Sequence, residues 1–127
     1  MSLKVAIFED DKDLADALKE MLTLQAFETV TCYNIREPHW REVDVVVADF
    51  RNKIVSFKEL RQECATEGLP LIAISGAETD HAFQLLKPFT TDELKKTIFQ
   101  SLVHAQEVGL TRKKASLVST ITGWLKG

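Results

Sequence analysis

The sequence predicts an α/β fold in which parallel strands alternate with helices. Short apolar runs rich in Val, Ile and Phe alternate along the chain with segments whose apolar residues recur every three or four positions. Several of these runs are apolar nearly throughout, as expected of strands that are covered on both faces. The helical segments begin with capping residues, so their limits are also predictable.

Five strands are predicted. They cover residues 4–8, 28–33, 43–48, 70–74 and 83–86. The second alternates Val30 and Cys32 with threonines, which is the pattern of an edge strand that is buried on one side only. The alternation of strands with helices favours right-handed crossovers in one sheet.

Three helices are predicted from apolar spacing and capping residues. The first carries an apolar stripe of Leu14, Ala17, Leu18, Met21 and Leu22. Acidic capping residues precede it at Asp10 and Asp11. The second begins at Ser56 with a capping box and ends at Gly68, and the third begins with a second capping box at Thr90.

Two connections are too short for ordinary helices. Residues 34–42 contain Pro38 and leave room for only a turn or two of helix. Residues 76–82 must cross back along a strand of roughly 17 Å, and seven extended residues reach about 23 Å. They can therefore form a strap but not a packed helix.

Polar side chains follow four of the predicted strands directly. Glu9 and Asp10 come after the first strand, Asp49 after the third, Ser75 after the fourth and Lys87 after the fifth. Ligands of open parallel sheets bind beyond the carboxyl ends of the strands. We therefore expect these five side chains to converge at one edge of the sheet.

The chemistry of this group suggests a metal-assisted phosphoryl transfer. Three carboxylates at close range repel one another unless a cation neutralises them. Oxygen ligands favour Mg²⁺ (or Mn²⁺), with a backbone carbonyl near Arg51 as a further ligand. Asp49 could then attack a phosphoryl group, while Lys87 and Ser75 stabilise charge on the transferring oxygens.

Four segments together resemble the response regulator receiver family of two-component signalling, over roughly residues 4–103. They read KVAIFEDDKDL, VDVVVADF, PLIAISG and LLKPF. The resemblance implies a flavodoxin-like, five-stranded parallel sheet in the order 2-1-3-4-5. It also implies that Asp49 is the phosphoacceptor, that Glu9 and Asp10 hold the metal, and that Lys87 precedes a cis proline. A histidine kinase or phosphotransfer protein would then be the phosphodonor.

The sequence departs from the family pattern at three places. Gln84 occupies the position of the family's aromatic switch residue, and Phe83 beside it would face the opposite side of the strand. Arg51 and Lys53 follow the phosphoacceptor, where they could reach the acidic pocket. The strap leaves helix 4 missing or reduced. Residues 34–42, described above, likewise leave helix 2 short. We therefore expect signal output through a different surface from the family's usual α4-β5-α5 face.

A receiver domain is predicted over residues 1–107 and a C-terminal tail over residues 108–127. The tail carries an apolar stripe of Leu117, Val118, Ile121, Trp124 and Leu125 at helical spacing. Such a stripe requires cover, so the tail packs either on the domain or in a homodimer.

Composition narrows the class of protein. The chain has 127 residues, a hydrophobic fraction of 45%, a net charge of -3 and a pI near 5.6. This size suits one domain, and the charge argues against nucleic acid or an anionic membrane surface as a partner. No apolar run approaches the ~20 residues of a membrane helix and no secretory signal is visible, so a cytoplasmic protein is expected.

Several conspicuous residues have structural interpretations. Cys32 and Cys64 are expected to be buried thiols rather than a disulfide or a metal site. Trp40 is expected to be a packing residue, and Lys87 could by itself be an ordinary surface lysine. His81 is expected to be a solvated loop histidine without a catalytic role.

Three functions remain open at this point. The first is a receiver that is not an enzyme beyond its own phosphorylation and dephosphorylation and that signals by protein contact. The second is a degenerate receiver that acts as an interaction or dimerisation module without phosphorylation, which Gln84 and the missing helix favour. The third is a phosphohydrolase with an aspartyl phosphate intermediate, but its DxD motif would require an acid at Arg51.

Overall fold

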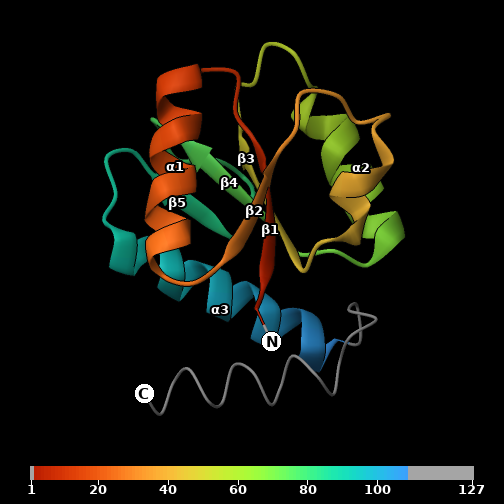
Figure 1. Ribbon diagram of the computed structural model, residues 1–127. Helices are drawn as coiled ribbons and strands as arrows, with labels where there is room; N and C mark the ends of the chain where they lie inside the picture. Colours follow the sequence, from red (N-terminus) through yellow and green to blue (C-terminus); the bar gives the residue numbers. More distant parts are fainter. Residues whose placement is uncertain (1, 109–127) are drawn as a thin grey trace.

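A computed structural model describes residues 2–108 as one parallel sheet with helices on both faces (Figure 1). The strands are β1 (Lys4–Phe8), β2 (Glu28–Thr31), β3 (Val45–Asp49), β4 (Leu71–Ser75) and β5 (Gln84–Leu86), and the helices are α1 (Lys12–Leu24), the 3₁₀ helix η1 (Pro38–Glu42), α2 (Phe57–Glu67) and α3 (Thr91–Glu107). All strands are parallel, in the order β2-β1-β3-β4-β5. The predicted flavodoxin-like topology is confirmed.

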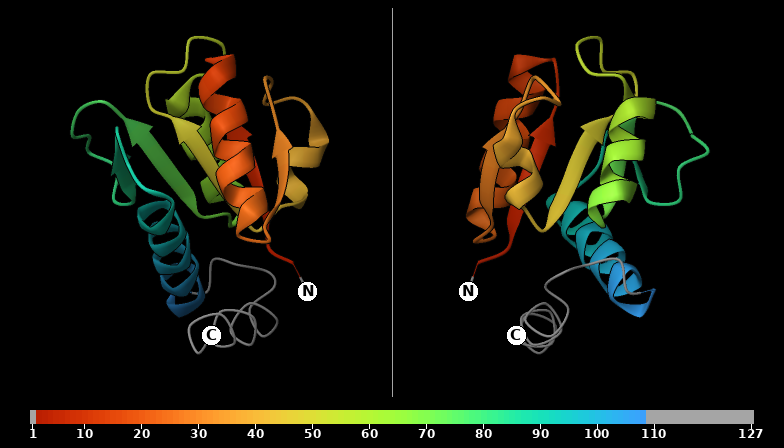
Figure 2. Two further views of the ribbon diagram at one scale, coloured as in Figure 1. Left: turned by 60° about the vertical axis from the view of Figure 1, so that its left-hand side comes forward. Right: turned by 90° about the vertical axis from the view of Figure 1, so that its right-hand side faces the viewer.

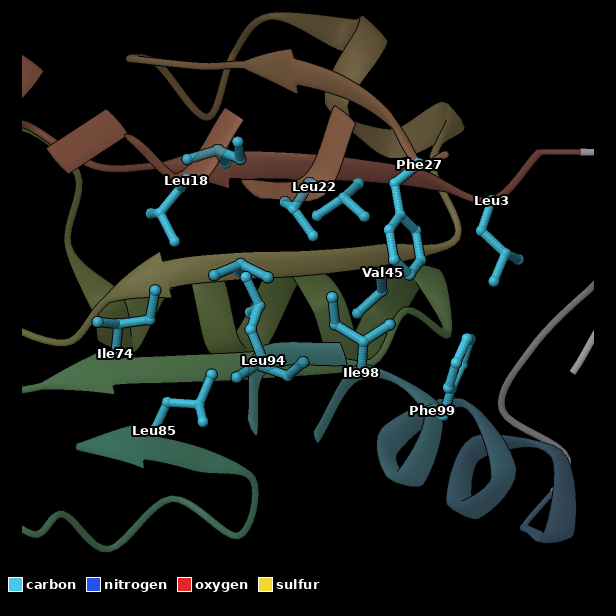
Figure 3. Close-up of a cluster of buried hydrophobic side chains, with 14 of the residues drawn as sticks. Leu3, Leu18, Leu22, Phe27, Val45, Ile74, Leu85, Leu94, Ile98 and Phe99 are labelled. Atoms are coloured by element: carbon cyan, nitrogen blue, oxygen red, sulfur yellow. The ribbon is translucent and has the colours of Figure 1, made fainter. Parts of the chain in front are cut away.

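The two faces of the sheet build two separate cores. Because successive side chains of a strand point to opposite faces, Val5 and Ile7 join one core and Ala6 and Phe8 join the other. Helices α1 and α3 cover the first face, and α2 with η1 covers the second (Figure 2). Figure 3 shows the first core, where Leu18 and Leu22 of α1 lie near Leu94 and Ile98 of α3. This two-sided burial explains the apolar strand sequences.

The helices begin and end at the residues that the capping patterns predict. Asp11 accepts hydrogen bonds from the backbone N–H groups of Asp13 and Leu14, so Asp11 rather than Asp10 caps α1. Ser56 caps α2, and Gly68 ends it in the left-handed conformation with φ of 70°. Thr90 and Glu93 form the predicted capping box of α3. The sequence-based limits of β2 were too long, because its ladder with β1 stops at Thr31.

The two short connections have the predicted character. Helix 2 is reduced to η1, whose Trp40 is fully buried against Phe8 with ring centroids 5.6 Å apart. No helix forms between β4 and β5 in the described chain, and residues 76–83 make the strap. Each connection therefore packs without the helix that a longer segment would provide.

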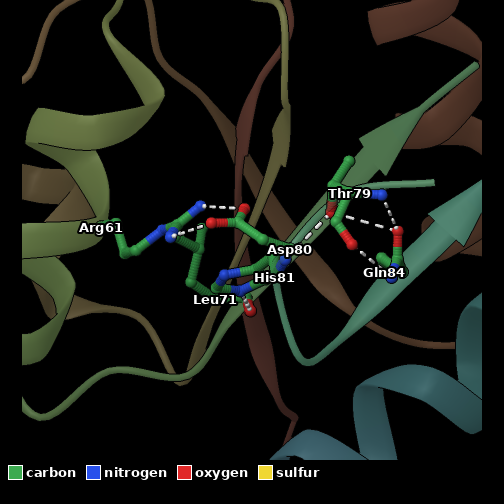
Figure 4. Close-up of polar contacts among 6 residues, drawn as sticks. All are labelled: Arg61, Leu71, Thr79, Asp80, His81 and Gln84. Atoms are coloured by element: carbon green, nitrogen blue, oxygen red, sulfur yellow. Dashed lines mark hydrogen bonds and ion pairs between the residues drawn. The ribbon is translucent and has the colours of Figure 1, made fainter. Parts of the chain in front are cut away.

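The strap is held by its own polar contacts (Figure 4). The side-chain oxygen of Gln84 accepts from the backbone N–H of Thr79 at 2.8 Å and from its hydroxyl at 3.0 Å, and the Gln84 amide donates to the Thr79 carbonyl at 3.2 Å. Asp80 pairs with Arg61 of α2 at 3.2 Å. These contacts tie the strap both to β5 and to α2.

The prediction that His81 is solvated is wrong. Its ring is half-buried, lies edge-on to Phe57 at 5.3 Å, and donates Nε2–H to the Leu71 carbonyl at 2.6 Å. Burial, followed by the nearby Arg61 charge, lowers the pKa of His81 against the opposing effects of the Leu71 carbonyl and Asp80. His81 thus anchors the strap against α2 and β4.

Several other predictions are confirmed within residues 2–108. Cys32 and Cys64 are free and buried, and burial raises the pKa of each thiol to about 12. None of the described helices is long and apolar enough to cross a membrane. The predicted tail stripe lies outside the described residues.

Candidate functional site

The carboxyl edge of the sheet brings the predicted site residues together. Glu9 and Asp10 follow β1 directly, Asp49 ends β3 and Ser75 ends β4, while Lys87 follows β5. The register pairs Phe8 with Ala48 and Ser75 with Leu86, so the strand ends lie level. The topology alone therefore gathers five residues that are distant in sequence.

Three carboxylates form a cluster at this edge. One oxygen from each of Glu9, Asp10 and Asp49 lies within 4.8 Å of the others. Glu9 is only 1% exposed; its Oε1 accepts from the backbone N–H of Asp11 at 3.0 Å, whereas its buried Oε2 has no hydrogen-bond partner. Burial raises the pKa of Glu9, the Asp11 N–H opposes this, and the charges of Asp49 and Asp10 raise it further.

This cluster fits a divalent cation on the chemistry of its atoms. A buried carboxylate oxygen without a partner is costly, and a cation would satisfy it. Hard cations take oxygen ligands at about 2.0–2.6 Å, so oxygens no more than 4.8 Å apart can share one ion. The predicted role of the Arg51 carbonyl as a further ligand stays a prediction.

Asp49 is accessible and faces a positive charge. Its side chain is 12% exposed, so the protein does not enclose it completely. Its Oδ1 lies 3.7 Å from the ammonium nitrogen of Lys87, which is itself 33% exposed. The Lys87-Pro88 peptide is cis, as the resemblance implies, and the Lys87 backbone N–H donates to the Ser75 carbonyl at 2.8 Å.

Ser75 joins the site to the strap. The residue is 3% exposed, and its hydroxyl oxygen accepts from the backbone N–H of Ala77 at 3.2 Å. A Cβ added to Gly76, the residue between them, would meet no atom within 4 Å. The first turn of the strap therefore already contacts the hydroxyl expected to bind transferring oxygens.

The loop after Asp49 contributes backbone rather than charged side chains. The N–H of Arg51 approaches Asp49 Oδ1 at 3.4 Å, and the N–H of Lys53 approaches Asp10 Oδ2 at 3.4 Å. Asn52 shapes the loop, because its Oδ1 accepts from two consecutive N–H groups, those of Ile54 and Val55. Sequence reasoning missed Asn52, although an Asn that begins such a turn is a known signal.

Comparison with solved structures identifies the fold. A response regulator receiver domain protein from Clostridium thermocellum matches with a TM-score of 0.71 at 19% identity, covering 84% of this chain and 98% of that chain. A chemotaxis response regulator of Vibrio cholerae matches with a TM-score of 0.68 at 18% identity, covering 80% and 100%. No family model and no curated protein matches the sequence.

A third solved structure has the same fold. The receiver domain of a sensor histidine kinase from Pseudomonas aeruginosa matches with a TM-score of 0.70 at 16% identity, covering 81% of this chain and 99% of that chain. That structure has a magnesium ion coordinated in its active-site cleft. The chain has the fold of a response regulator receiver domain, in an atypical form with a short helix 2 and a strap in place of helix 4.

Proposed function

We propose that the protein is a phosphoacceptor receiver of two-component signalling, phosphorylated on Asp49. The observation that carries this proposal is the joint geometry of Asp49, which shares a three-carboxylate cluster and faces Lys87 at 3.7 Å. A lone acidic turn residue would need neither feature. The receiver fold adds support, because it places this cluster where the sheet opens to solvent.

The proposed chemistry transfers a phosphoryl group from nitrogen to oxygen. A carboxylate oxygen of Asp49 attacks the phosphorus of a phosphohistidine on the donor protein, and the P–N bond breaks with its electron pair going to the imidazole. Lys87 and the Ser75 hydroxyl stabilise the negative charge of the transferring oxygens. A cation held by Glu9, Asp10, Asp49 and the Arg51 carbonyl would neutralise charge on donor and acceptor.

Mg²⁺ or Mn²⁺ is the expected cation, and a histidine kinase or phosphotransfer protein is the expected donor. Output would be by protein contact in the cytoplasm. Because the strap replaces helix 4, this output would use a surface different from the family's usual α4-β5-α5 face. Turnover is limited to the chain's own aspartyl phosphate, so the protein is not proposed to be an enzyme.

The intact cluster weighs against a phosphorylation-independent module. A receiver that had lost phosphorylation would have no need to keep Glu9 buried with an unpaired oxygen beside two further carboxylates. Such an arrangement costs stability, and a bound cation would offset that cost.

The test is chemical phosphorylation followed by intact mass measurement. Incubation with acetyl phosphate and Mg²⁺ should add one phosphoryl group to the wild-type chain and none to Asp49→Asn. Asp16→Asn, an exposed aspartate of α1, is the matched control and should be modified like the wild type. An adduct that persists in Asp49→Asn, or no adduct on the wild type, would contradict the proposal.

A further inference from the structure

The outer face of α3 carries a groove that the phosphoacceptor chemistry does not use. It has a volume of about 570 Å³ and is lined along the helix by Asp92, Lys96, Phe99, Val103, His104 and Glu107. Val103 is an apolar residue with 38% exposure. The groove borders the end of the strap, since the His104 ring lies 5.4 Å from that of Phe83.

We propose that this groove binds the chain's own C-terminal segment, residues 111–125, as a helix antiparallel to α3. The described chain ends at Val108, one residue beyond Glu107 at the end of the groove, and residues 109–127 continue from there. Residues 109 and 110 are enough for a short connection between antiparallel helices. The segment thus starts where the groove ends.

Length and pattern suit this occupant. The groove runs from Asp92 to Glu107, which corresponds to roughly 22 Å of helix, and a helix over residues 111–125 has about the same length. Leu117, Val118, Ile121, Trp124 and Leu125 recur at helical spacing and form one apolar stripe. An apolar stripe of this length matches the extent of the groove.

Charge favours the antiparallel direction. Residues 109–127 contain four basic residues and no acid. In this direction the basic run of Arg112, Lys113 and Lys114 lies beside Glu107, and Lys126 lies beside Asp92. A parallel arrangement would need a long return connection and would set the same basic run beside Lys95 and Lys96 as well as Asp92.

The segment depends on the groove for its helicity. A helix of about 15 residues is marginal in water by itself, and Gly123 with the neighbouring threonines weakens it further. The short connection holds the segment at a high effective concentration near α3, which favours the chain's own segment over that of a second copy. The segment therefore folds when it docks on its own domain.

Hydrogen exchange of the full chain tests this proposal. Amides of residues 117–125 should exchange at least about tenfold more slowly than in an isolated peptide of residues 109–127, independently of protein concentration. Val103→Asp should abolish that protection, and Ile121→Asp, a change within the segment, should do the same. Leu24→Asp, at an apolar residue of α1 that is 75% exposed, is the matched control and should leave the protection unchanged.

Three outcomes would overturn the proposal. The segment could exchange as fast as the free peptide, or Val103→Asp and Leu24→Asp could have the same effect. Protection that rises with concentration, together with a dimer in sedimentation, would assign the groove to a second copy instead. Because none of these measurements involves phosphorylation, their failure would leave the phosphoacceptor role untouched.

Discussion

Two polar clusters of this domain differ in how completely their atoms are paired. At the carboxyl edge, Glu9 Oε2 is buried without a partner among carboxylates of like charge. In the strap, Gln84 uses both its oxygen and its nitrogen on Thr79, and His81 pairs with the Leu71 carbonyl. The first cluster is open to a ligand, whereas the contacts of Thr79, His81 and Gln84 in the second are closed on one another.

The two clusters are therefore expected to have different roles: the paired contacts of the strap stabilise the fold, and the carboxyl edge binds a ligand. Buried polar groups that satisfy one another stabilise a fold, whereas unpaired like charges cost stability until something binds them. We therefore expect substitutions in the strap to lower the free energy of unfolding. Substitutions at the carboxyl edge should instead lower phosphorylation or cation binding, and some should raise stability.

The largest effect is expected at Lys87. Lys87→Met removes the ammonium 3.7 Å from Asp49, so the rate of phosphorylation by acetyl phosphate should fall roughly 100-fold, with the fold retained. Intact mass against time measures the rate. Lys19→Met, an exposed lysine of α1, should react like the wild type. Equal rates in the two variants would show that Lys87 has no role in the phosphorylation of Asp49.

The next effect tests the closed cluster. Gln84→Ala removes three hydrogen bonds to Thr79 and should lower the free energy of unfolding by about 2 kcal/mol, measured by urea denaturation. Cation affinity should stay unchanged. Gln62→Ala on the exposed side of α2 provides the control and should have little effect. An unchanged free energy of unfolding in Gln84→Ala would show that the stability of the strap does not depend on this side chain.

At Glu9 the expected change has the opposite sign. Burial raises the pKa of Glu9, so ionising this carboxyl in the folded state costs stability when no cation is bound. Glu9→Gln should therefore raise the free energy of unfolding in EDTA by about 1 kcal/mol at pH 7, and the gain should vanish below about pH 4.5. Saturating Mg²⁺ should stabilise the wild type alone, so that the wild type then has the higher free energy of unfolding. If Glu9→Gln instead had a lower free energy of unfolding than the wild type in EDTA, the description of Glu9 as an unpaired buried carboxylate would be contradicted.

The smallest effect concerns His81 and pH. Its pKa is lowered from 6.5, so below about pH 6.5 the unfolded chain takes up a proton more readily than the folded chain. The free energy of unfolding should consequently fall between pH 6.5 and 5.5, and His81→Gln should make this fall shallower. Identical slopes in the wild type and His81→Gln would show that His81 is not the group responsible.

The sequence predicts the fold well where single residues decide local structure. Ser56, Gly68 and the Thr90 box set helix limits through hydrogen bonds to neighbouring backbone, so their signal is local. The convergence of the candidate site residues was also predictable, because the carboxyl ends of parallel strands must share one edge. Asp49 and Lys87 could be placed together without knowledge of any side-chain contact.

The side-chain contacts of the strap were beyond such reasoning. Its length excluded a helix, but the partners of His81 depend on the tertiary placement of Leu71 and Phe57, which no local pattern encodes. From the sequence, Gln84 indicated only that the family's aromatic switch residue is missing. In the folded chain its amide instead ties β5 to the strap.

Titration calorimetry with Mg²⁺ tests most directly whether the open cluster is a cation site. The wild-type chain should bind one ion, Asp10→Asn should bind it at least about tenfold more weakly, and Asp80→Asn in the strap should bind it like the wild type. No heat of binding in the wild type, or an unchanged Mg²⁺ affinity in Asp10→Asn, would contradict this account of the site.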